Sequence, residues 1–140
     1  MLKQRLIHPD LLEVLAAAGH GAKVLITDAN YPASTQVGEN AAVVYLNLAP
    51  GLVTATEVLE VLRTAIPVED AAVMEPDSGP EPSIFKEFRQ LLPDLALTMF
   101  SRFEFYEEAS GPDTCLQIVT GEQRLYANLL LTIGVVAPGR

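Results

Sequence analysis

Apolar residues recur along the chain in two alternating periods, one typical of helices and the other of strands. Helical spacing predicts helices over 9–18, 54–66 and 83–92 and a short one from 101; short apolar runs predict strands over 24–27, 42–47, 70–74, 95–100 and 115–119. Segment 126–136 is apolar without a decisive period, so helix and strand both remain open there. Alternating strands and helices predict an α/β fold: a single three-layer domain over 1–140, its mostly parallel sheet covered by helices on both faces.

Polar residues mark where several of these helices begin. Thr54 and Ser101 are each followed three residues later by glutamate, which is the capping-box pattern of a helix N-terminus. Pro9 suits the first position of the first helix, and His8 before it is interpreted as a helix-start residue.

In a parallel sheet, ligands bind outside the carboxyl ends of the strands. This rule brings together Asp28, Arg102 and the segment 120–122, since each follows a predicted strand. The helix that starts at 101 adds the positive end of its dipole to this edge, which favours oxygen-rich ligands. His20 precedes its strand, so it belongs to the opposite edge unless its loop folds over or a second subunit supplies it.

His20 and Asp28 stand at opposite ends of one short apolar run and are the first candidates for proton transfer. Histidine titrates near neutral pH, and a carboxylate can orient an imidazole ring or hold a substrate hydroxyl. An ordinary hydrogen-bonded surface pair is the alternative.

Composition narrows the possible partners. The 140 residues carry a net charge of -9 with scattered basic residues, so neither a nucleic-acid partner nor a membrane partner is expected. No signal peptide or membrane-spanning run is visible, which predicts a cytoplasmic protein. Cys115, the single cysteine, is expected to be a buried inert thiol. A metal site would require His20, Asp28 and Glu122 to converge; no metal and no cofactor are expected.

Four groups of residues, in order along the chain, are similar to the ribose pyranase and fucose mutarotase family of sugar-handling proteins. The similarity extends over nearly the whole chain. The residues that carry it are Leu11-Leu12 through Gly19-His20-Gly21, Asp28-Ala29-Asn30-Tyr31-Pro32-Ala33, Arg102-Phe103-Glu104-Phe105-Tyr106-Glu107, and Thr120-Gly121-Glu122 with Tyr126-Ala127-Asn128.

This resemblance implies a cofactor-independent mutarotase in which His20 is the general acid/base. It also implies that Asp28, Arg102, Tyr126 and Asn128 bind the hydroxyls of a monosaccharide. The family further implies a ring-shaped homo-oligomer with sites between subunits. Arginine at 102 resembles the fucose type, so L-fucose is the expected substrate; the alternatives are a D-ribose pyranase, a non-catalytic monosaccharide-binding protein and a structural ring subunit.

Two positions depart from the family pattern. Ala22-Lys23 replaces an acidic pair, and a cation there would disfavour the protonated form of His20. Tyr31 replaces a common phenylalanine, and the resemblance implies that its hydroxyl would be an added donor near the sugar.

Each sugar-binding candidate also has a purely structural interpretation. Asp28 suits an Asx turn and Asn128 a chain turn. Arg102 suits an exposed ion pair with Glu104 or Glu122. Tyr126 suits ordinary core packing.

Overall fold

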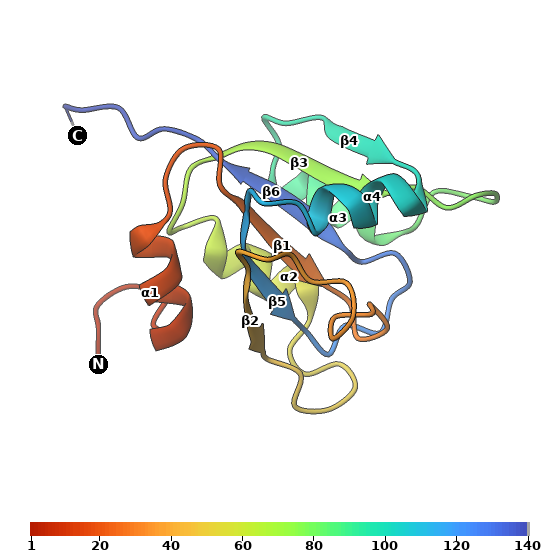
Figure 1. Ribbon diagram of the computed structural model, residues 1–140, viewed down its shortest axis with the longest axis horizontal. Coiled ribbons are helices and arrows are strands. Elements are labelled where there is room, and N and C mark those ends of the chain that lie inside the picture. Colours follow the sequence, from red (N-terminus) through yellow and green to blue (C-terminus); the bar gives the residue numbers. More distant parts are fainter. Residues whose placement is uncertain (140) are drawn as a thin grey trace.

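The computed structural model describes residues 1–139, which form a six-stranded sheet with four helices (Figure 1). The helices are α1 (Pro9–Ala17), α2 (Ala55–Leu62), α3 (Ile84–Leu91) and α4 (Arg102–Ala109). The strands are β1 (Lys23–Thr27), β2 (Ala42–Tyr45), β3 (Val68–Met74), β4 (Leu97–Phe100), β5 (Thr114–Val119) and β6 (Leu129–Ile133).

The sheet has the strand order β2-β5-β1-β6-β3-β4. Strands β2, β5 and β1 are mutually parallel, and β3 is parallel to β4. Strand β6 lies between β1 and β3 and is antiparallel to both. The predicted α/β fold with a mostly parallel sheet is therefore confirmed, and 126–136, left open from the sequence, contains a strand.

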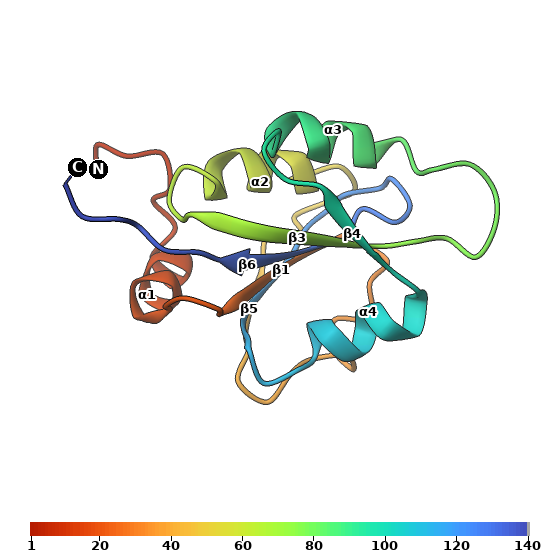
Figure 2. The same cartoon turned by 90° about the horizontal axis from the view of Figure 1, so that it is seen from above.

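Helices cover both faces of the sheet, as predicted. Figure 2 shows α2 and α3 on one face and α4 on the other, with the segment that follows β1 on the same side as α4. The larger hydrophobic cluster lies under α2 and α3, and the smaller one lies under α4. Because side chains alternate along a strand, Ile26 contributes to the first cluster and Leu25 to the second.

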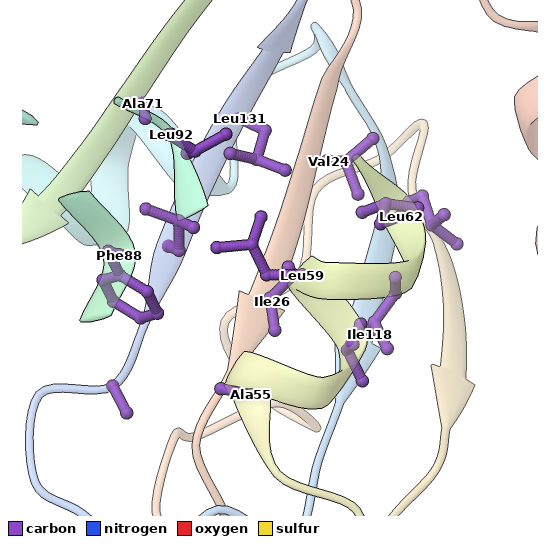
Figure 3. Close-up of a cluster of buried hydrophobic side chains, with 14 of the residues drawn as sticks. Val24, Ile26, Ala55, Leu59, Leu62, Ala71, Phe88, Leu92, Ile118 and Leu131 are labelled. Carbon is purple, nitrogen blue, oxygen red and sulfur yellow. The ribbon is translucent and has the colours of Figure 1, made fainter. Parts of the chain in front are cut away.

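The larger cluster joins α2 to the centre of the sheet. Leu59 of α2 lies beside Ile26 of β1, and Phe88 of α3 fills the space toward β6 (Figure 3). All three side chains are fully buried. Helix α2 presents its apolar side here because Ala55, Val58, Leu59 and Leu62 recur at helical spacing.

Local signals placed the starts of the helices well. Both predicted capping boxes are present, with Thr54 and Ser101 each accepting the backbone N–H of the glutamate three residues on. His8 is the N-cap of α1 and accepts the backbone N–H of Leu11 through Nδ1 at 3.4 Å. Helix α2 ends at Leu62 rather than at 66, because residues 63–66 form tight turns before Pro67, which disfavours helical geometry in the preceding residue.

The longest helix within residues 1–139, α1, has nine residues. A membrane-spanning helix needs about 20 apolar residues, so none of these helices is a candidate span.

Truncating Leu59 to alanine should lower the free energy of unfolding by about 2–5 kcal/mol, because it opens a cavity between α2 and the sheet. The matched control is Leu48→Ala, since Leu48 is 85% exposed and its loss should change stability by no more than about 0.5 kcal/mol. Urea denaturation of both variants tests this. Equal stabilities would mean that α2 is not packed on the sheet as described.

Candidate active site

Asp28 and Asn128 are joined by reciprocal hydrogen bonds at one edge of the sheet. Asp28 directly follows β1, and Asn128 directly precedes the antiparallel β6. The backbone N–H of Asp28 donates to Asn128 Oδ1 at 2.8 Å, and Asn128 Nδ2 donates to Asp28 Oδ2 at 3.3 Å. Since β1 and β6 are paired neighbours, the strand reversal itself brings these two side chains together.

Both residues are 4% exposed. Burial raises the pKa of Asp28, while hydrogen bonds from the backbone N–H groups of Asn30 and Tyr31 and from the Asn128 amide act in the opposite direction. The backbone N–H of Ala127 also donates to this carboxyl, and Asn128 uses only one of its two amide hydrogens on Asp28, so the pair retains an amide donor for a ligand hydroxyl.

Arg102 and Tyr126 lie at this same edge. Arg102 begins α4, with one residue separating it from the end of β4, and its guanidinium carbon lies 5.7 Å from the ring centroids of both Phe103 and Tyr106. The Tyr106 side chain raises the pKa of Arg102 most, with smaller contributions from Asp77 and Tyr126. Arg102 therefore remains a permanently charged donor, and its guanidinium lies over two aromatic rings.

Tyr126 has φ 60°, in the left-handed region that non-glycine residues seldom adopt. Its side chain is half-buried and packs against both hydrophobic clusters. The core-packing interpretation thus holds for part of the ring, and the unusual backbone geometry turns the chain toward Asn128.

His20 lies at the opposite edge of the sheet, as its place before β1 predicts. Its Nε2 is 2.7 Å from Glu69 Oε1, and the side chain is 60% exposed. Strand β1 separates His20 from Asp28, and its five residues alone extend about 16 Å. The two residues therefore do not meet within one chain.

Lys23 does not act as a free cation beside His20. Its Nζ lies 3.0 Å from Glu108 Oε2 on α4, and the lysine side chain is 22% exposed. This ion pair offsets the positive charge that the Ala22-Lys23 departure introduces.

Glu122 has a structural role that the sequence did not reveal. It accepts the backbone N–H of Ala55 at the start of α2, and it accepts from the backbone and side chain of Arg124. The Arg124 guanidinium also donates hydrogen bonds to Thr56 of α2 and to Glu87 of α3. The cluster therefore fastens the segment after β5 to two helices, and its members share no spacing by which a sequence pattern could have found them.

Gly121 is required where this segment touches the loop after β2. A Cβ atom at this position would lie 2.5 Å from the backbone oxygens of Ala49 and Leu52. No larger residue fits there without moving the backbone, so the glycine of the Thr120-Gly121-Glu122 motif has a packing reason.

The structural alternatives have mixed outcomes. Asp28 does form the Asx-type turn, since its Oδ1 accepts the Asn30 backbone N–H at 3.0 Å. The partners considered for Arg102 are engaged elsewhere: Glu104 with Ser101, and Glu122 with Arg124. His20, Asp28 and Glu122 do not converge on a metal-binding geometry within residues 1–139.

In α/β folds of this kind, small ligands bind outside the carboxyl ends of the strands, and the buried polar side chains of Asp28 and Asn128 lie at that edge here. The chain belongs to the RbsD / FucU transport protein family, whose model matches residues 1–136. It is 32% identical to the human fucose mutarotase over 94% of this chain and 91% of that protein.

Two solved structures are similar over almost the whole chain. Bacillus subtilis RbsD complexed with D-ribose superposes with a TM-score of 0.85 at 28% identity, covering 98% of this chain and 100% of that one. The fucose mutarotase of Streptococcus pneumoniae in complex with L-fucose superposes with a TM-score of 0.84 at 28% identity, with the same coverage.

Replacing Glu122 with glutamine should lower the free energy of unfolding at pH 7 by about 1–3 kcal/mol, because it removes the charge that Arg124 neutralises. Although burial alone raises the pKa of Glu122, the Arg124 and Ala55 interactions outweigh it and lower this pKa below the usual 4.5. The stabilisation is thus complete above pH 4.5 and is lost as the pH falls through the lowered pKa.

Chemical denaturation across this pH range tests the prediction. The wild-type and Glu122→Gln stabilities should converge in acid, while the charge-matched control at the exposed Glu107, Glu107→Gln, should follow the wild type throughout. A constant difference at all pH values would show that the ionised form of Glu122 is not what stabilises the cluster.

Proposed function

We propose that this chain is a cofactor-independent sugar mutarotase that interconverts the anomers of a monosaccharide, with L-fucose as its substrate. The observation that carries the proposal is the buried Asp28–Asn128 pair at the carboxyl edge. Two relatives support the proposal: one is a fucose mutarotase, and the structure of another was determined in complex with L-fucose.

The residues at this edge suit a polyhydroxylated ligand. Asn128 offers a free amide donor beside the carboxylate oxygens of Asp28, so together they can hold adjacent sugar hydroxyls. Arg102 supplies a fixed fork of donors, and Tyr126 supplies a hydroxyl and a ring face. These residues would determine the pose of the sugar and its selectivity.

The reaction requires only two proton movements. The anomeric hydroxyl loses its proton, the bond between the anomeric carbon and the ring oxygen breaks, and the ring oxygen gains a proton. The open-chain aldehyde then closes from its other face by the reverse steps. No electrons and no groups leave the sugar, so a general acid/base contributing about 10²–10⁴-fold is sufficient.

His20 is the proposed acid/base, supplied by a neighbouring subunit of a ring-shaped homo-oligomer. It is exposed at the far edge of the sheet, and Glu69 is positioned to orient the imidazole through Nε2. The other ring nitrogen is then free to serve as the proton-transfer atom. A second copy that presents its His20 edge to the Asp28 edge of the first would complete the site.

Two other functions have some support. The likeness to a structure with D-ribose favours a ribose pyranase, in which the ring size changes as well as the anomer. A putative sugar-binding protein superposes with a TM-score of 0.81 at 28% identity, which favours a non-catalytic binding protein. Arginine at 102 is the residue that favours the fucose type.

Magnetisation transfer by proton NMR between the anomers of L-fucose, D-ribose and D-galactose tests this function. The intact protein should accelerate exchange of L-fucose most, and His20→Gln should reduce the acceleration by about 10²-fold or more. His8→Asn is the matched control, because it alters the other histidine and keeps an N-capping side chain for α1. Stabilisation by sugar without faster exchange would instead favour the binding protein.

Mixing two inactive variants tests the shared site. His20→Gln and Asp28→Asn chains, unfolded and refolded together in equal amounts, should recover about a quarter of the wild-type sites, since random neighbours pair one intact His20 with one intact Asp28. Each variant refolded alone should remain inactive. If the mixture also stays inactive while the wild type regains activity, the two residues act within one chain.

A further inference from the structure

The hydroxyl of Tyr31 is buried without a hydrogen-bond partner. The residue is 7% exposed, and its oxygen makes no hydrogen bond within residues 1–139. Leaving a buried hydroxyl unpaired costs folding free energy, whereas a phenylalanine of the same shape would carry no such cost. The hydroxyl is therefore not explained by the stability of the free chain.

Tyr31 lies between the two parts of the proposed sugar site. Its ring packs edge-on against Tyr106 at a centroid distance of 5.5 Å, and Tyr106 in turn carries the Arg102 guanidinium over its face at 5.7 Å. On the other side, Tyr31 is three residues from Asp28, whose carboxyl accepts its backbone N–H.

The phenol is a neutral donor. Burial raises the pKa of Tyr31, and repulsion of its ionised form by an ionised Tyr106 and by the Asp28 carboxylate raises it further. The group therefore keeps its proton at physiological pH and can both donate and accept one hydrogen bond, as a sugar hydroxyl can.

Burial of the hydroxyl does not separate it from a ligand that reaches Asp28. Asp28 and Asn128 are each 4% exposed, so they are as deeply buried as Tyr31. The half-buried side chains of Tyr106 and Tyr126 pack against the same cluster as Tyr31. A ligand that reaches the Asp28 carboxylate is therefore close to Tyr31, since the Asp28 charge acts on the Tyr31 phenol.

We propose that Tyr31 is a specificity-determining residue whose hydroxyl hydrogen-bonds one hydroxyl of the monosaccharide held by Asp28 and Asn128. This inference rests on the proposed sugar site and adds a contact to it. A site built to hydrogen-bond a substrate hydroxyl rejects the analogue that lacks it, because its own buried polar group is then left unpaired.

The test compares the wild type with Tyr31→Phe and with the control Tyr45→Phe, whose tyrosine is 57% exposed at the end of β2. Without sugar, the melting temperature of Tyr31→Phe should equal that of the wild type or exceed it by up to about 4 °C. Its acceleration of anomer exchange at low L-fucose concentration should fall by about tenfold. Tyr45→Phe should change neither quantity.

Monodeoxy analogues of L-fucose then identify the contact. The wild type and Tyr31→Phe should differ on every analogue except the one that lacks the contacted hydroxyl, on which their rates should be equal. Sugar-dependent increases in melting temperature should show the same pattern, which gives a readout independent of turnover.

Three results would overturn the inference. Equal wild-type and Tyr31→Phe rates on L-fucose would show that the Tyr31 hydroxyl does not contact the sugar, while the proposed function would stand. A lower melting temperature of Tyr31→Phe with unchanged rates would show that the hydroxyl has an internal partner, for which the unpaired Gln117 Oε1 is the candidate. A wild type that neither accelerates exchange nor is stabilised by any sugar would overturn the proposed function and the inference together.

Discussion

Strand β6 runs antiparallel between β1 and β3, and the two parallel parts of the sheet meet only through it. Its reversed direction places its first residues at the edge where β1, β3 and β4 end. Asn128 thereby stands beside Asp28, and the Tyr126 turn stands near Arg102. The polar groups proposed to hold the sugar therefore depend on a backbone pairing rather than on flexible loops, which is how a site keeps its geometry.

Two groups of polar side chains lie at opposite edges of the sheet. The carboxyl edge carries the buried hydrogen-bonding groups, and the amino edge carries His20 with Glu69. Helix α4 connects the two, because Arg102 begins it and Glu108 near its end pairs with Lys23 at the start of β1. One chain can thus contribute to two sites at once, as the proposed ring-shaped homo-oligomer requires.

The features predicted from the sequence depend on residues close together in the chain, whereas the features it missed depend on residues far apart. Capping boxes, the His8 cap and the buried strands depend on neighbouring residues, so they were readable. Asp28, Arg102, Tyr126 and Asn128 were named individually, from strand ends and from resemblance. Their arrangement followed from the direction of β6, for which an all-apolar segment gives no local signal. The Glu122 and Arg124 cluster joins segments far apart in sequence, and no spacing predicts such a contact.

The central position of β6 also bears on how the protein is made. Strand β6 follows the other five strands along the chain, yet it occupies an interior place in the sheet. Until it emerges from the ribosome, β1 and β3 each expose an unpaired edge, and such edges template association with other chains. The two parallel parts of the sheet therefore cannot join until residues 129–133 have been synthesised, so the complete sheet forms late in synthesis relative to its first five strands.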